Sequence, residues 1–222
     1  MTDDANKAAS GQGGTVPLFA TPFAAVNTGA DRDFNARVAS LCESQRSAAT
    51  TTDDAARDPL HFRSRNDLFD SSDAAGELRR LLLEQTSAVV AGLNNQGAAE
   101  FGKWHAQARG WCSVVQRNGY VPSQHFTGAS WLAVYCAQAG DPDEGMKNAG
   151  VLRLYERRLG SIFRDASTGD LKSPYRYGNH VWTPLPGWMA LFPAHVPHEV
   201  SVVRSDTSLI LVFAMIRFMD KA

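Results

Sequence analysis

Two histidines, each at the end of an apolar strand-like segment, are the side chains best suited to chemistry in this chain. His125 follows the apolar stretch that starts at Gly110, and His198 follows residues 188–192. A neutral imidazole at the end of a strand can point into the mouth of a β-barrel while the strand itself stays packed. Two such rings, far apart in sequence, are what a barrel needs to hold a metal ion, so His125 and His198 are the predicted metal ligands.

The other four histidines have weaker patterns around them. His195 lies three residues before His198, but the Val-Pro dipeptide between them favours a turn, which argues against joint ligation. His180 precedes the same segment and is a reserve candidate. His61 and His105 lie in unpatterned surroundings, and we interpret them as surface or hydrogen-bonded histidines.

A third ligand is harder to find. Mononuclear iron oxygenases commonly bind the metal with two histidines and one carboxylate, which leaves coordination positions open. The acid usually lies two residues after the first histidine, where this chain has Thr127. Of the nearby acids, Glu199 should point away from His198 because side chains alternate along a strand. Glu156 is therefore the predicted third ligand, and the alternative is a solvated charge beside the two arginines that follow it.

An anionic co-substrate such as 2-oxoglutarate needs a cation inside the barrel. Arginine suits this role because its planar guanidinium pairs with a carboxylate through two hydrogen bonds. Arg204, six residues after His198, is the predicted cofactor-binding residue, with Arg217 and Arg153 as alternatives. The competing interpretation for each is a surface charge.

The bulk composition is that of an ordinary soluble globular domain. The chain has 222 residues, is 44% hydrophobic and 20% charged, and has a formal net charge of −1. This charge gives no basic patch for nucleic acid or anionic membrane, and no apolar run is long enough to span a bilayer. We expect a disordered polar tail over residues 1–14 and a single domain over residues 15–222. The polar, acidic start and three scattered cysteines, interpreted as buried small side chains, favour a cytoplasmic protein.

Hydrophobic periodicity changes from helical to strand-like after residue 101. We expect helices over residues 33–46 and 71–93, the second capped by Ser71 or Ser72. Expected strands cover residues 16–23, 111–115, 131–137, 150–155, 188–192, 199–204 and 209–218. Helices followed by several short strands predict an α+β fold or helices packed on a β-sandwich.

Several of these segments together resemble a known family. They are residues 18–22 (LFATP), a strand starting at Trp111, residues 132–136 (LAVYC), residues 150–158 (GVLRLYERR), and a Phe-Pro pair followed by His198. This pattern is similar to the 2-oxoglutarate and Fe(II)-dependent oxygenases, closest to a bacterial and phage branch. The resemblance covers roughly residues 16–218, and its Phe-Pro-x-x-x-x-His element is the most specific part. It implies a double-stranded β-helix (jelly roll, cupin-like) with the N-terminal helices packed on the outside.

The family's own site motifs differ at key positions. Where the family has His-x-His, an alignment without gaps from Gly128 places Gln124 and Phe126, with His125 between them. His125 would face the pocket only if the strand register slipped by one residue. The family's cofactor arginine aligns with Ser208.

Two hypotheses for function follow. In the first, the chain is a non-haem Fe(II) oxygenase that uses molecular oxygen, with or without 2-oxoglutarate, to hydroxylate, desaturate or cyclise a small molecule. Four aromatic residues would line its pocket or pack in the core: Trp111, Tyr120, Trp131 and Trp188. In the second, the chain is a metal-free jelly-roll binding protein that has lost catalysis. Under either hypothesis a homodimer is the oligomeric state to expect, because it is the commonest one among soluble proteins.

Overall fold

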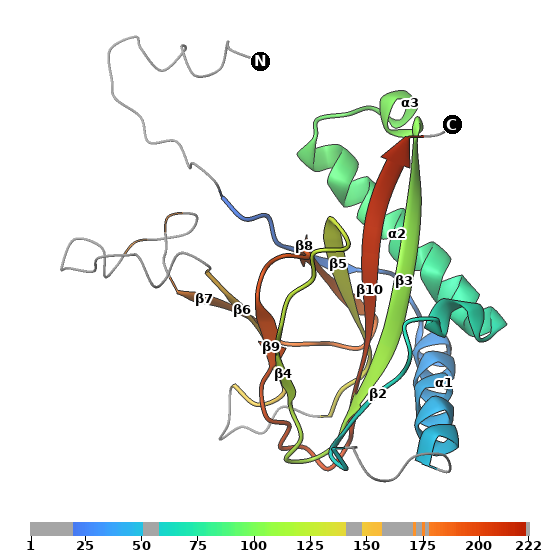
Figure 1. Cartoon of the computed structure of the whole chain (residues 1–222), viewed down its shortest axis with the longest axis vertical. Coiled ribbons are helices and arrows are strands. Elements are labelled where there is room, and N and C mark those ends of the chain that lie inside the picture. The colour runs from blue at the N-terminus through green and yellow to red at the C-terminus, as the bar shows by residue number, and fades with distance from the viewer. Residues whose placement is uncertain are drawn as a thin grey trace.

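The protein is built from two antiparallel β-sheets and a layer of helices (Figure 1). The computed structural model describes residues 20–50, 58–140, 148–156, 171, 175 and 178–220. The expected tail over residues 1–14 and the start of the expected strand at residues 16–19 lie outside the described residues. No helix in the described part of the chain combines the length and apolar character needed to cross a membrane.

The larger sheet has six strands in the order β1-β8-β5-β10-β3-β2. In that order the strands are Ala24–Asn27, Trp188–Pro193, Trp131–Gln138, Leu209–Asp220, Trp104–Val115 and His61–Arg63. The two longest strands, β10 and β3, pair over their full length, and β10 also pairs with β5. All strand pairs in this sheet are antiparallel.

The smaller sheet has four strands in the order β4-β9-β6-β7 and lies across from the centre of the larger one (Figure 1). Its strands, in that order, are Val121–Gln124, His198–Val200, Leu152–Tyr155 and Asn179–Trp182. Its pairs are also antiparallel. Successive strands therefore alternate between the two sheets over much of the chain.

Strand alternation divides the apolar side chains into two cores. On β3, Trp111 and Val115 face an inner core between the sheets, whereas Cys112 and Val114 face an outer core under the helices. β10 divides in the same way. The central strands are apolar on both faces because both faces are covered.

The outer core is closed by α1 (Arg32–Thr50) and α2 (Asp73–Leu93), with the short η2 (Leu68–Asp70) and α3 (Ala98–Phe101) beside them. The carboxylate of Asp31 accepts a hydrogen bond from the Phe34 backbone N–H at 2.7 Å at the start of α1. Ser72 caps α2 in the same way, accepting from the Ala75 N–H at 3.2 Å. Both helices place apolar stripes against β3 and β5, and Figure 1 shows them on the side of the large sheet away from β4 and β9.

Most predicted elements are present, with altered ends. Both helices form, although α1 runs on to residue 50, and the strands predicted near residues 111, 131, 150, 188 and 209 correspond to β3, β5, β6, β8 and β10. The predicted strand 199–204 is wrong beyond Val200, because the chain leaves the sheet there. The first strand begins at Ala24, after the prolines. The short strands β2, β4 and β7 were not predicted.

A tight approach at Gly110 gives a test of this packing. A Cβ at Gly110 would lie within 3.0 Å of the Phe69 ring and the Phe213 carbonyl, whereas one at Gly128 would meet nothing within 4 Å. Gly110→Ala should therefore lower the free energy of unfolding by about 1–3 kcal/mol, the usual cost of overpacking. Gly128→Ala is the matched control and should change it little. Urea unfolding of both variants measures this, and equal effects would contradict the packing of η2 on β3.

Candidate functional site

His198 is the first residue of β9 and is completely buried. Its Nδ1–H donates a hydrogen bond to the Val196 carbonyl at 2.9 Å, which leaves the Nε2 lone pair free. This Nε2 has no hydrogen-bond partner among the described residues. Burial is the main cause that lowers the pKa of His198 to about 4, and the nearby charge of His125 lowers it further. The ring is therefore a neutral acceptor held in one tautomer, the form that a metal or a hydrogen-bond donor requires.

The pairing of β4 with β9 decides which side chains accompany His198. Val121 is opposite Val200, and Gln124 is opposite His198, so three steps on β4 match two steps on β9. The extra residue is a β-bulge at the segment that contains Pro122, where a missing backbone N–H is tolerated. Directly opposite residues share one face of a sheet, so the Gln124 side chain lies beside the His198 ring.

Aromatic rings surround the imidazole. The Phe192 ring lies 5.2 Å from it, Phe126 5.9 Å and Phe213 6.3 Å, measured between ring centroids. Trp111 contacts both Phe126 and Phe213 at 5.1 and 5.2 Å. His198 thus lies at the aromatic end of the inner core.

Three buried polar atoms in this cluster have no hydrogen-bond partner among the described residues: His198 Nε2, Gln124 Nε2 and Trp111 Nε1. The imidazole nitrogen is an acceptor, and the indole and amide nitrogens are donors. Unsatisfied buried polar groups are uncommon in native proteins and call for an explanation, such as a ligand or water. Gln124 and Phe126 are half-buried, so the edge of the cluster at β4 is partly exposed.

The two other predicted ligands lie near this end but do not complete a metal site with His198. His125 is exposed, since the bulge turns Gln124 and Phe126 rather than His125 toward the inner core. Glu156 follows β6, whose Leu154 is opposite His198, and its backbone N–H donates to the Gly178 carbonyl at 3.1 Å. Among the described residues, no three His, Cys, Asp or Glu side chains are grouped so that they could hold a metal ion.

The predicted cofactor arginine lies elsewhere. Arg204 is exposed and donates to the Asn118 side-chain carbonyl at 2.7 Å, beside the start of β4, whereas His198 lies beside its end. Arg217 is exposed and bonds Gln107. The structure therefore does not bring Arg204 or Arg217 to His198.

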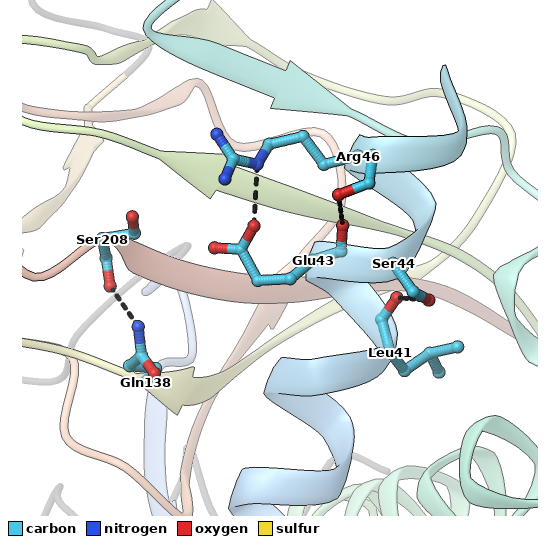
Figure 2. A network of polar contacts seen from close by, with 7 residues as sticks. Leu41, Glu43, Ser44, Arg46, Gln138 and Ser208 are labelled. Carbon is cyan, nitrogen blue, oxygen red and sulfur yellow. Dashed lines mark hydrogen bonds and ion pairs between the residues drawn. The ribbon is translucent and has the colours of Figure 1, made fainter. Parts of the chain in front are cut away.

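The remaining candidate positions are engaged on the outer surface of the small sheet or in backbone contacts. Arg153 pairs with Glu199 at 2.9 Å, and Tyr155 donates to the same carboxylate at 2.6 Å. Glu199 points away from His198, as alternation predicts. Ser208, which aligns with the family's cofactor arginine, uses its carbonyl to accept from the Gln138 side chain at 3.1 Å (Figure 2).

The sequence pattern named Trp111 among the aromatic residues that would line the pocket or pack in the core, but it did not single out Gln124, because a glutamine side chain does not suggest a metal ligand. One signal did point to Gln124, namely the gapless alignment that placed it on a family histidine. The proline two residues earlier lies in the bulge that places Gln124 opposite His198. Among the other histidines, His61 bonds Ser113 at 3.2 Å and His180 lies against Phe23.

Comparison with known proteins identifies solved structures of similar fold. No protein-family model matches the chain, and no curated protein matches it by sequence. A prolyl-4-hydroxylase from Pseudomonas putida matches with a TM-score of 0.55 at 12% identity, covering 89% of this chain and 92% of that one. A 2-oxoglutarate-Fe(II) oxygenase family oxidoreductase from Burkholderia pseudomallei matches with a TM-score of 0.53 at 12% identity, over 89% and 84%. HygX from Streptomyces hygroscopicus, solved with nickel and 2-oxoglutarate, matches with a TM-score of 0.52 at 14% identity, over 89% and 83%.

The chain therefore has the fold of the 2-oxoglutarate and Fe(II)-dependent oxygenases. The residues around His198 do not fit the iron centre expected from that fold. A two-histidine, one-carboxylate site needs three side chains with lone pairs on one face, and this face presents His198, Gln124 and Phe126. A phenylalanine ring supplies no ligand atom.

The low pKa of His198 makes stability depend on pH. The unfolded histidine takes up a proton below about pH 6.5 and the folded one only near pH 4, so the unfolded state binds more protons between these values. Stability should fall as the pH is lowered through this window, by roughly 2 kcal/mol between pH 7.5 and pH 5. Urea unfolding at both pH values measures the loss, which His198→Leu should largely remove. His195→Gln, at an exposed neighbour, should keep the wild-type loss, and an unchanged loss in His198→Leu would contradict the burial of a neutral imidazole.

Proposed function

We propose that this chain is a metal-free binding protein built on the oxygenase-type double-stranded β-helix, and that it binds a small organic molecule at the His198 end of the barrel. The observation that carries the proposal is the group of three unpartnered buried polar atoms, on His198, Gln124 and Trp111, within one aromatic cluster. Leaving such atoms unpaired costs about 1–3 kcal/mol each, so a partner for them is strongly favoured.

The chemistry of these atoms defines the kind of ligand. Two donors, the Gln124 amide and the Trp111 indole, suit an acceptor oxygen, and the His198 Nε2 suits a donor hydrogen. A hydroxyl group does both. The half-buried ring of Phe126 offers flat apolar surface for the rest of the molecule. A small hydroxylated aromatic or alicyclic compound therefore matches the site, as drug-sized ligands usually combine apolar contact with few polar ones.

A second candidate function is the iron oxygenase itself, with His198, His125 and Glu156 as ligands and Arg204 binding 2-oxoglutarate. A specific observation favours it: the Nδ1–H of His198 is fixed by a backbone carbonyl, which leaves Nε2 ready to ligate. His125 is also near enough for its charge to affect the pKa of His198. If bound, Fe(II) would supply the oxygen chemistry, and it would need His125 and Glu156 to turn toward His198.

Metal content separates the two functions. Protein purified without oxygen and dialysed against Fe(II) at pH 7.5 should hold far less than one iron per chain, because His198 is one ligand without a complete set. Combining Gln124→His with Phe126→Asp should raise Fe(II) affinity by about tenfold or more, since it places one ligand opposite His198 and a second at a ring that contacts it. Stoichiometric iron in the wild type that is lost in His198→Ala would establish the oxygenase instead.

A simple probe tests the binding site directly. Phenol joins a flat apolar ring to a hydroxyl that both accepts and donates, and it should bind in the millimolar range by calorimetry. Gln124→Leu and His198→Leu should each weaken binding about tenfold, the effect of one lost buried hydrogen bond. His195→Gln is the control and should bind as the wild type does. Equal affinity in all four proteins would exclude the His198 cluster as the binding site.

A further inference from the structure

A cavity lies at the β2 edge of the large sheet, near the C-terminal end of α1. Its volume is about 140 Å³, several times the roughly 30 Å³ that one water molecule takes in the liquid, so it has room for a small organic molecule. None of its lining residues belongs to the aromatic cluster around His198, although one of them, Arg63, contacts Trp111. The lining residues are Arg46, Asp58, Pro59, His61, Phe62, Arg63, Val114 and Gln116.

The Arg63 guanidinium is a cation without an acidic partner. Its Cζ lies 4.3 Å from the centroid of the Trp111 ring, and its Nη2 donates to the Asn66 side-chain carbonyl at 2.9 Å. No carboxylate of a described residue forms an ion pair with it. Partial burial lowers the pKa of Arg63, and no acid offsets that shift. An anionic group in the cavity would therefore stabilise the charged guanidinium.

Asp58 is an acid of the same cavity that also lacks an oppositely charged partner. Its Oδ1 accepts from the Leu60 N–H at 2.9 Å, and its backbone carbonyl accepts from the His61 N–H at 3.2 Å, which fixes the turn that carries it. It forms no ion pair with any described residue, Arg63 included. Within the described part of the chain, nothing donates to its second carboxylate oxygen, which is left to accept from a ligand.

The rest of the wall is either neutralised or apolar. Arg46 donates from its Nε to the Glu43 carboxylate at 2.7 Å on the same helix (Figure 2). Pro59, Phe62 and Val114 supply apolar surface. The cavity thus combines one unpaired cation, one unpaired acid and an apolar wall.

We propose that this cavity binds a small free amino acid with an apolar side chain. The ligand carboxylate pairs with Arg63, whose planar guanidinium suits a carboxylate, and the ligand ammonium donates to Asp58. The ligand side chain packs against Phe62 and Val114. A zwitterion fits better than a simple organic acid, which Asp58 would repel, and better than a simple amine, which Arg63 would repel.

L-valine is a suitable probe, because it joins a carboxylate, an ammonium and a branched apolar side chain in a small volume. In an NMR titration of the isotope-labelled full-length protein, we expect saturable shifts of the backbone amides of residues 60–63, Val114 and Gln116. The Kd should lie in the millimolar range. Isovalerate, which lacks the ammonium, and isobutylamine, which lacks the carboxylate, should each bind about tenfold more weakly, because each leaves one charged partner unused.

Substitutions test the two charges separately. Arg63→Met keeps a long unbranched side chain without the charge and should weaken valine binding by about tenfold or more. Asp58→Asn keeps the acceptor for the Leu60 N–H and should also weaken valine binding by about tenfold, without weakening isovalerate. Arg65→Met and Asp67→Asn make the same charge changes at exposed positions that do not line the cavity, and both should bind valine as the wild type does.

The proposal is overturned by any of three results: no saturable shift at millimolar valine, isovalerate binding as tightly as valine, or Arg63→Met binding as tightly as the wild type. Circular dichroism checks that each variant is folded. Arg63→Lys keeps the charge but not the planar fork, so it should retain part of the affinity and replaces Arg63→Met if that variant does not fold. Phenol bound at the His198 end would shift amides of β4 and β9 instead, so the two sites are tested independently.

Discussion

The register of β4 against β9 is the constraint on which the candidate site depends. One extra residue at Pro122 turns Gln124 and Phe126 toward His198 and leaves His125 exposed. Without the bulge the side chains would alternate the other way, and His125 would share a face with His198. A one-residue difference thus separates a surface with two histidines on it from one with a histidine, an amide and a benzene ring. The same fold can hold an iron centre or an apolar hydrogen-bonding site according to this register.

Both faces of the large sheet are covered, so the strands that carry the candidate site also contact the helix layer. Trp111 and Cys112 are neighbours on β3, yet one belongs to the aromatic cluster around His198 and the other to the outer core under α1. Residues of β10 alternate in the same way, so its Phe213 stacks on Trp111 while Val212 faces the helices. Because protein interiors are close-packed, a change on one face of β3 must be accommodated by the strand that carries the other face.

Sequence reasoning recovered the parts of the fold that depend on local patterns. Both helices have clear apolar stripes and polar caps. The long strands are apolar on both faces, which is typical of a sheet that is covered on both sides. It missed β4 because four residues with a proline carry no period, and it placed Arg204 on a strand that ends at Val200. His198 was singled out because it follows the Phe192-Pro193 pair, which ends β8. Its companions could not be chosen by type, since a bulge is a property of two strands and is not visible in either one alone.

Unpaired polar atoms at the end of the inner core would cost a large part of the protein's stability. Three unpaired buried atoms at about 1–3 kcal/mol each would together approach the whole stability of a typical domain, about 5–15 kcal/mol. Apolar residues at Gln124 and His198 would avoid that cost and would suit the phenylalanines around them. A ligand of the proposed kind, or an ordered water, would act as the partner that satisfies these atoms. The aromatic rings around them exclude bulk water, which makes each hydrogen bond to that partner stronger than it would be at the surface.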